Sequence, residues 1–145
     1  MRRRRDDIRK DVEEDVREER ADGEAHEEEQ NLAQEGLELI RNYRSNNVLE
    51  GRSWTAGMNT CSSANGCRID AVDLDIRNCT ATCDLLKFDT DLHVYNYDTG
   101  SDSIFTRVIR LQDITPDEVK VTSLVTWSDR FGSHSFDIST SMFNW

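Results

Sequence analysis

The sequence contains no long apolar run. No segment approaches the roughly 18 consecutive apolar residues that a membrane-spanning helix requires, and none has the short apolar core of a secretory signal peptide. We therefore expect the chain, as given, to be water-soluble.

Basic residues are scarce in comparison with acidic ones. The chain has 18 Lys and Arg against 29 Asp and Glu, a formal net charge of −11. The one basic run, RRRR at residues 2–5, is followed at once by Asp6 and Asp7. Because a surface of this sign repels phosphate backbones, we expect no nucleic-acid binding by the folded part.

Catalytic motifs are missing as well. The sequence has no G-x-S-x-G or H-E-x-x-H motif and no phosphate-binding glycine loop. His93 and His134 stand alone in segments that alternate like strands. We accordingly predict a protein that is not an enzyme and that has no cofactor.

Proline is nearly absent, and the single residue, Pro116, lies far from the N-terminal part, where charged helix-forming residues dominate. There the apolar residues form one narrow line, as at Ile8 and Val12. Further along, an apolar stripe with spacings of three and four appears at Leu32, Ala33, Leu37, Leu39, Ile40 and Tyr43. This pattern predicts a helix that ends near Asn46 and Asn47 and docks only its second half on a core.

After Ser45 the composition shifts to Thr, Ser, Asp, Val and Ile. Alternating segments occupy residues 72–76, 92–97, 103–114, 118–127 and 134–145, and turn residues separate them. Short turns between consecutive strands predict an antiparallel sheet, which together with the preceding helix gives an α+β fold. We expect a long N-terminal helix packed on roughly four strands.

The four cysteines are Cys61, Cys67, Cys79 and Cys83, for which three pairings are possible. The short, flexible loops favour Cys61–Cys67 and Cys79–Cys83, and each closed loop would add about 2 kcal/mol of stability. The alternatives are free thiols or a zinc site with four cysteine ligands, although the two C-x₂-C pairs usual in such sites are missing. Disulfides predict an extracellular location.

Several segments together resemble those of a known family. They are LAQEGLELIRNYRSNN at residues 32–47, Trp54, CSSANGC at residues 61–67, and a C-terminal segment that contains VKVTSLVTW and ends in FNW. Over residues 31–145 the chain resembles bacterial type IV pilin-like proteins, in particular minor-pilin and prepilin-like sequences. The resemblance implies a structural subunit of a type IV pilus-like filament at the cell surface, acting in attachment, motility or DNA uptake.

The first 30 residues depart from this family. In pilins the N-terminal half of the spine helix is apolar: it anchors the subunit in the membrane before assembly and then packs against other pilin subunits. Residues 1–30 are instead highly charged. We hypothesise that they are an engineered, water-soluble replacement; the alternatives are a natural solvated helix or a disordered arm.

The expected organisation is therefore a charged helical extension (residues 1–30) followed by a pilin-like globular domain (residues 31–145), and we expect this chain to be monomeric. The resemblance also implies which residues dock the spine helix on the sheet. They are Leu32, Leu37, Leu39, Ile40, Tyr43, Val121, Val125, Trp127, Phe136, Ile138 and Met142.

Three other interpretations remain open. One is a pseudopilin of a type II secretion system, another is a secreted ligand-binding or adhesive domain, and the least favoured is a zinc-dependent or hydrolytic enzyme. Some pseudopilins bind calcium through loop carboxylates, and oxygen-rich loops suit this ion. Asp89, Asp91, Asp98 and Asp102 are the candidate ligands, although their spacing matches no defined calcium loop and solvated turn acids are the alternative.

Overall fold

The computed structural model describes residues 27–144, and the described residues from Leu32 onward form a compact unit. The expected charged extension over residues 1–30, and with it the hypothesis of an engineered replacement, lies almost wholly outside the described residues. Trp145 lies outside them too.

Within residues 27–144 the fold is α+β, with one helix packed on an open antiparallel sheet of seven strands. The sheet is larger than the expected four strands. The elements are the helix at residues 27–49, the 3₁₀ turn η1 (Asn59–Ser62), β1 (Cys67–Ile69), β2 (Ile76–Asn78), β3 (Leu85–Asp89), β4 (Val94–Asn96), β5 (Ser101–Thr115), β6 (Glu118–Asp129) and β7 (Gly132–Phe143).

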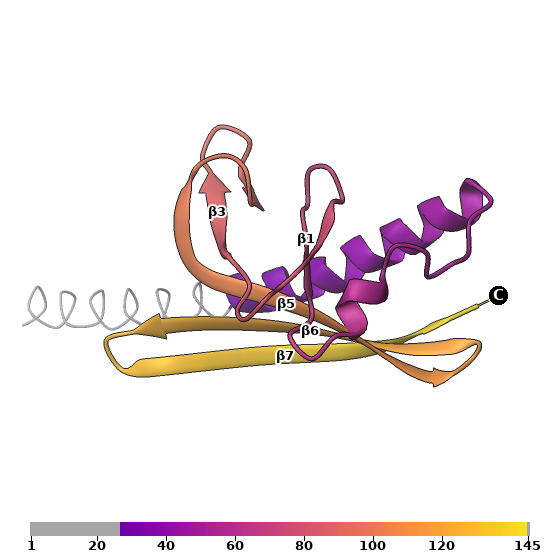
Figure 1. The fold of residues 1–145 in the computed structure, drawn as a ribbon. Coiled ribbons are helices and arrows are strands. Elements are labelled where there is room, and N and C mark those ends of the chain that lie inside the picture. Colours follow the sequence, from indigo (N-terminus) through magenta and orange to yellow (C-terminus); the bar gives the residue numbers. More distant parts are fainter. Residues whose placement is uncertain (1–26, 145) are drawn as a thin grey trace, which may run out of the picture. The chain divides into compact units, whose positions relative to one another are not determined.

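The long strand β5 organises the sheet. One of its edges pairs first with β3, at Thr106 and earlier residues, and then with β1, at Ile109. Its other edge pairs with β6 from Thr106 to Thr115, and β7 pairs with β6. Figure 1 shows that β5 bends between the part that pairs with β3 and the part that lies in the flat layer with β6 and β7.

The three long strands follow the alternation of the sequence. Inward positions of β5 and β6 hold buried residues such as Phe105, Ile109, Val121 and Val125, while their neighbours face outward. The predicted strands at residues 103–114 and 118–127 are confirmed, and the segment 134–145 coincides with β7 up to Phe143. The β6–β7 ladder runs through twelve consecutive residue pairs without a register shift.

The prediction of a strand at residues 72–76 is wrong. The Asp70 carboxylate accepts a hydrogen bond from the Val72 amide at 2.7 Å, and the Asp73 carboxylate accepts one from the Asp75 amide at 2.9 Å. Side-chain acceptors two residues away from a backbone donor stabilise turns and compete with a strand ladder. Val72 is consequently 63% exposed, and β2 begins only at Ile76.

The predicted strand at residues 92–97 is shorter than expected for the same reason. The Asp89 carboxylate accepts hydrogen bonds from the amides of Asp91 and Leu92, and His93 adopts a left-handed conformation with φ of 54°. Only Val94–Asn96 remain as β4.

The helix buries its apolar stripe against the sheet in two clusters. Every residue with an expected docking role lies in or beside one of them. Leu37, Leu39, Ile40, Tyr43, Val121 and Met142 belong to the first, Leu32, Val125, Trp127 and Phe136 to the second, and Ile138 packs against both.

The helix runs to residue 49, slightly beyond its expected end. Asn47 is inside the last turn, where its buried side chain donates hydrogen bonds from Nδ2 to the carbonyls of Trp54 and Ala56. The chain then reverses at Gly51, which has a φ of 76°. Asn47 therefore holds the returning loop to the helix instead of ending the helix.

Gly36 sets how closely the helix approaches the sheet. A β-carbon at this position would collide with Ser123 Oγ and would lie 2.9 Å from Ile109 Cδ1 and 3.1 Å from Arg107 Cδ. Real β-carbons do not come this close to their neighbours, so the helix and the strands can meet here only if position 36 has no side chain.

The substitution Gly36→Ala is therefore expected to lower the free energy of unfolding by about 1–3 kcal/mol, because overpacking outweighs the roughly 1 kcal/mol gained in helix propensity. Urea denaturation measures the difference. Gln34→Ala, on an exposed position of the same helix, is the control and should change stability by less than about 0.5 kcal/mol. A Gly36→Ala variant as stable as the parent would contradict the close approach.

Candidate functional site

Arg107 lies at the centre of the contact between helix and sheet. Its position in β5 points inward, and the residue is 0% exposed. Nη1 donates hydrogen bonds to the Leu32 carbonyl at 3.1 Å and to Glu35 Oε1 at 2.9 Å, and Nη2 donates to the Ile69 carbonyl at 3.2 Å. One guanidinium thus connects the helix, β5 and β1.

Burying a charge costs several kcal/mol unless the charge is paired and its donors find acceptors. Nη1 and Nη2 of Arg107 meet this requirement with three acceptors on two other elements, and the planar guanidinium suits such divergent bonding. The buried Nε has no hydrogen-bond partner among the described residues. The Glu35 side chain is 39% exposed, so water weakens the Coulomb attraction of the pair. The Arg107–Glu35 pair therefore adds less to stability than a fully buried ion pair would, but its hydrogen bonds still fix the position of the helix.

Arg107 is not among the residues that the sequence predicts to be functional or to dock the helix. A signal was present, because Arg107 occupies an inward position of an alternating segment between Phe105 and Ile109. A charged residue at such a position requires a partner, and no pattern in the sequence identifies Glu35, 72 residues away, as that partner.

Two disulfides brace the loops above the sheet. Cys61 pairs with Cys67 across the loop from η1 to β1, and Cys79 pairs with Cys83 across the turn from β2 to β3. These are the pairs that the loop lengths predict. Because all four thiols are bonded, neither the zinc site nor the free thiols considered as alternatives fit this structure.

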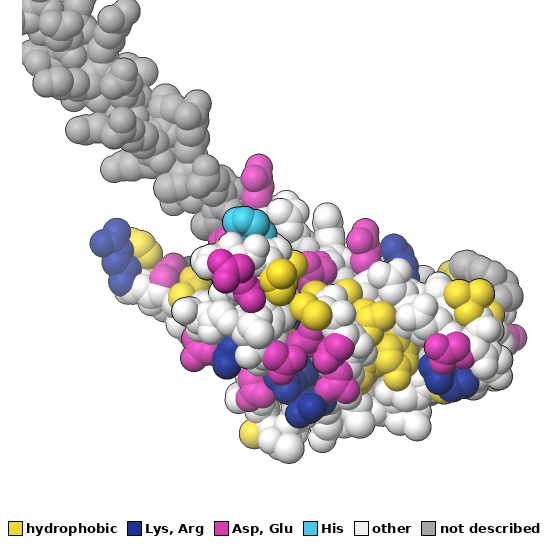
Figure 2. Space-filling view, turned by 90° about the horizontal axis from the view of Figure 1, so that it is seen from above, with side chains coloured by type: hydrophobic (Ala, Val, Ile, Leu, Met, Phe, Trp, Pro, Cys, Tyr) yellow, Lys and Arg dark blue, Asp and Glu magenta, His cyan; other side chains and the backbone are white. Residues whose placement is uncertain are grey.

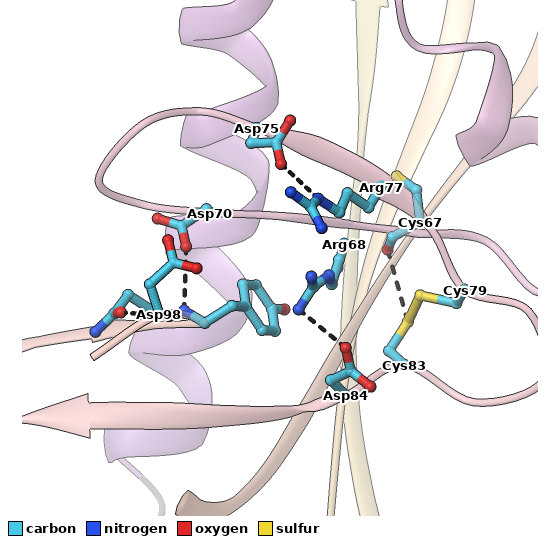
Figure 3. Close-up of polar contacts among 11 residues, drawn as sticks. Cys67, Arg68, Asp70, Asp75, Arg77, Cys79, Cys83, Asp84 and Asp98 are labelled. Atoms are coloured by element: carbon cyan, nitrogen blue, oxygen red, sulfur yellow. Dashed lines mark hydrogen bonds and ion pairs between the residues drawn. A yellow bond between two sulfur atoms is a disulfide. The ribbon is translucent and has the colours of Figure 1, made fainter. Parts of the chain in front are cut away.

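A stacked group of polar residues lies beside the second disulfide (Figure 3). The Arg68 guanidinium sits 4.2 Å from the centre of the Tyr97 ring, and Arg68 Nη1 lies 3.1 Å from Asp84 Oδ2. Burial raises the pKa of the Tyr97 phenol, so this group stays neutral at physiological pH. The cation over the ring ties β1 to the segments that flank β3 and β4.

Three carboxylates, those of Asp70, Asp73 and Asp98, gather nearby with oxygens within 4.8 Å of one another. Both oxygens of the buried Asp70 already accept backbone hydrogen bonds, from the amides of Val72 and Tyr97. Acidic and basic side chains intermingle on the face of the molecule that Figure 2 views from above. The Asp70 carboxylate therefore holds two loops together through backbone hydrogen bonds.

The predicted calcium candidates do not come together. Asp98 belongs to the carboxylate group just described, whereas Asp89 accepts a hydrogen bond from the Thr99 hydroxyl at 2.6 Å and closes its own turn. Asp91 and Asp102 are exposed and belong to neither arrangement. Asp70 and Asp73 were missed because residues 72–76 were interpreted as a strand, which would have placed Asp73 on an outward face.

Two of the three histidines lie among the described residues, and they occupy different settings. His93 is exposed in the turn before β4. His134 stacks on Trp127 with ring centres 5.4 Å apart, and its Nε2 lies 3.0 Å from Asp129 Oδ1. The contact with His134 holds the pKa of the Asp129 carboxyl below its usual value. The Asp129–His134 pair, together with the hydrogen bond from the Phe131 amide to Asp129, stabilises the β6–β7 turn.

Neither family models nor curated proteins nor solved structures yield a match to this chain. Among the described residues, no helix is both long enough and apolar enough to cross a membrane. The two disulfides fit a domain of an oxidising compartment, such as the exterior of a cell.

The Glu35→Gln substitution should lower the free energy of unfolding by about 1.5–3 kcal/mol, because a hydrogen bond between charged groups is replaced by a weaker one and Arg107 stays buried. Thermal or urea unfolding provides the measurement. Glu38→Gln, an exposed acid on the same helix, should leave stability nearly unchanged. Equal effects of the two substitutions would refute the proposed role of the buried pair.

Hydrogen bonds from the Thr99 hydroxyl and from the Leu92 and Asp91 amides hold the pKa of Asp89 below its usual value. Since the folded-state pKa is the lower one, this group stabilises the fold above the unfolded pKa of about 3.9, and the contribution disappears as the pH falls through the folded pKa. Thr99→Val should raise the pKa of Asp89 in a carboxyl NMR titration. Thr99→Ser keeps the hydroxyl and should not.

Proposed function

We propose that the chain is the head domain of a pilin-like subunit, a structural protein of a type IV pilus-like extracellular filament. The observation that carries this proposal is the position of the apolar stripe of the helix. From Leu32 to Tyr43 the stripe packs across one face of an antiparallel sheet, and Arg107 fastens it there. A helix held along its length by a globular head can extend beyond that head and join neighbouring subunits.

The disulfides support a location outside the cell. They close the loop between η1 and β1 and the turn between β2 and β3. Figure 1 shows the β1–β2 and β3–β4 hairpins, whose bases these disulfides flank, rising away from the flat layer of β6 and β7. The disulfides stay intact in an oxidising environment. A head domain of about 100 residues is stable by only a few kcal/mol, so the contribution of each disulfide to its stability is substantial. Such loops suit a surface that meets solvent and other cells.

In this proposal the partners are other pilin subunits, which bind through an apolar N-terminal half-helix that residues 1–30 do not provide. Burial of roughly 1000 Å² of apolar helix surface at about 25 cal/mol per Å² gives a gross driving term of tens of kcal/mol before entropic losses. The subunit would be anchored in the membrane by this half-helix before assembly. The head would act in attachment, motility or DNA uptake.

The test replaces residues 1–30 by the leader and apolar half-helix of a resident pilin in a bacterium that assembles type IV pili. We expect immunogold labelling of the head along the filaments, since the helix would lead into a head that holds it rigidly. The control joins the same half-helix to an unrelated secreted domain of similar size, which should not enter the filaments. Unlabelled filaments despite correct membrane insertion would count against the proposal.

The runner-up is a pseudopilin of a type II secretion system, for which the same head architecture would serve. The observation that favours it is the group of Asp70, Asp73 and Asp98, because loop carboxylates hold calcium in some pseudopilins. Thermal unfolding in calcium and in a chelator separates the two candidates. A calcium-dependent melting temperature that Asp73→Asn abolishes would favour the pseudopilin.

A further inference from the structure

The tripeptide Asn78-Cys79-Thr80 joins the end of β2 to the turn that leads to β3. Asn-x-Ser/Thr, with any residue but proline in the middle, is the acceptor sequence for N-linked glycans. No other asparagine of the chain is followed two residues later by serine or threonine. A tripeptide this short also occurs by chance, so its geometry and its location decide whether it can serve as an acceptor.

Both side chains that define the acceptor lie on the surface. Asn78 and Thr80 are exposed, whereas Cys79 between them is only 3% exposed. The buried sulfur of Cys79 is bonded to Cys83. The disulfide therefore uses the one side chain of the tripeptide that points into the domain, and it leaves the asparagine and the threonine accessible from outside.

The nitrogen that a glycan would occupy is not engaged in the fold. Asn78 Oδ1 accepts a hydrogen bond from the Ser63 hydroxyl at 3.1 Å, so the carboxamide is held through its oxygen. Among residues 27–144, no atom accepts a hydrogen bond from Asn78 Nδ2. The nearby Asn65 differs, because its Nδ2 donates to the Thr80 carbonyl at 2.6 Å. Only at Asn78, therefore, is an acceptor sequence combined with an available amide nitrogen.

The surroundings of Asn78 leave room for a large group. Asn78 is the last residue of β2 and lies opposite Cys67 in the β1–β2 ladder. Among the described strands β2 pairs only with β1, so no described strand borders its other side. An N-linked glycan is bulky and needs a surface position of this kind. The fold can therefore carry a glycan at Asn78 without rearrangement.

The cellular compartment is the remaining condition. Acceptor tripeptides of this kind are used in surface loops of secreted proteins. Disulfides form and persist in the same oxidising environments and are rare in the cytosol. Both cysteine pairs of this domain are bonded, and one of them includes the middle residue of the tripeptide. The acceptor sequence and the disulfides thus point independently to one location, outside the cytosol.

We propose that Asn78 is an N-glycosylation site, for which the second substrate is an oligosaccharide carried on a lipid pyrophosphate. Asn78 Nδ2 forms a bond to C1 of the first sugar, and the bond between C1 and the phosphate oxygen breaks. Nδ2 loses one proton to a base of the transferase, the lipid pyrophosphate leaves, and nothing is oxidised or reduced. The site needs the location that the disulfides indicate, but it does not need the pilin-like role.

The first test secretes the full chain, behind a cleavable signal peptide, from a host that N-glycosylates its secreted proteins. Intact-mass spectrometry should show the mass of one oligosaccharide added to the parent chain, and peptide-N-glycosidase should remove it. Asn78→Gln and Thr80→Ala should each abolish the added mass, whereas Thr80→Ser keeps the hydroxyl and should retain it. Asn65→Gln is the matched control, because Asn65 is exposed nearby but belongs to no acceptor tripeptide, and this variant should still be modified.

The second test separates the acceptor from the disulfide. The double variant Cys79→Ser, Cys83→Ser keeps an acceptor tripeptide without the bond and should be modified to the same extent as the parent. Circular dichroism of Asn78→Gln should match that of the parent, which shows that the loss of the glycan is not a loss of the fold. An unmodified parent overturns the proposal, and so does modification of the double variant alone, because the disulfide would then block Asn78. A glycan that survives Asn78→Gln also overturns it.

Discussion

The buried guanidinium of Arg107 is the constraint on which the arrangement of helix and sheet depends. A charge that leaves water must find acceptors, and the acceptors available are a helix carbonyl, a helix carboxylate and a carbonyl of β1. All three hydrogen bonds require the helix and β1 to lie where both reach the guanidinium on β5. Gly36 allows that position, since any side chain there would push the helix away from Arg107 and Ser123.

The two ends of the sheet are built in different ways as a result. On the side of β1 and β3, short strands depend on disulfides and on turns closed by the carboxylates of Asp70 and Asp89. On the side of β6 and β7, a regular ladder of twelve residue pairs forms without a disulfide.

The prediction from sequence succeeded where one physical signal dominated. Alternation located β5, β6 and β7, because half-buried strands of ten or more residues leave a clear period of two. It failed at residues 72–76, where the same alternation was present but Asp70 and Asp73 captured the backbone amides that a strand would need. The predicted calcium ligands do not form one group. They were chosen because they are close in the sequence, but the turns point their carboxylates in different directions; the residues are Asp89, Asp91, Asp98 and Asp102.

By itself, the sequence determined the fold class, the apolar stripe of the helix, the three long strands and the disulfide pairs. Each of these depends on interactions among residues that are close in the chain or that repeat with a fixed period. Only the tertiary structure decided that Arg107 meets Glu35 and that Asp70 lies beside Asp98. Those outcomes depend on how distant segments cross in space, and no local pattern encodes the crossing.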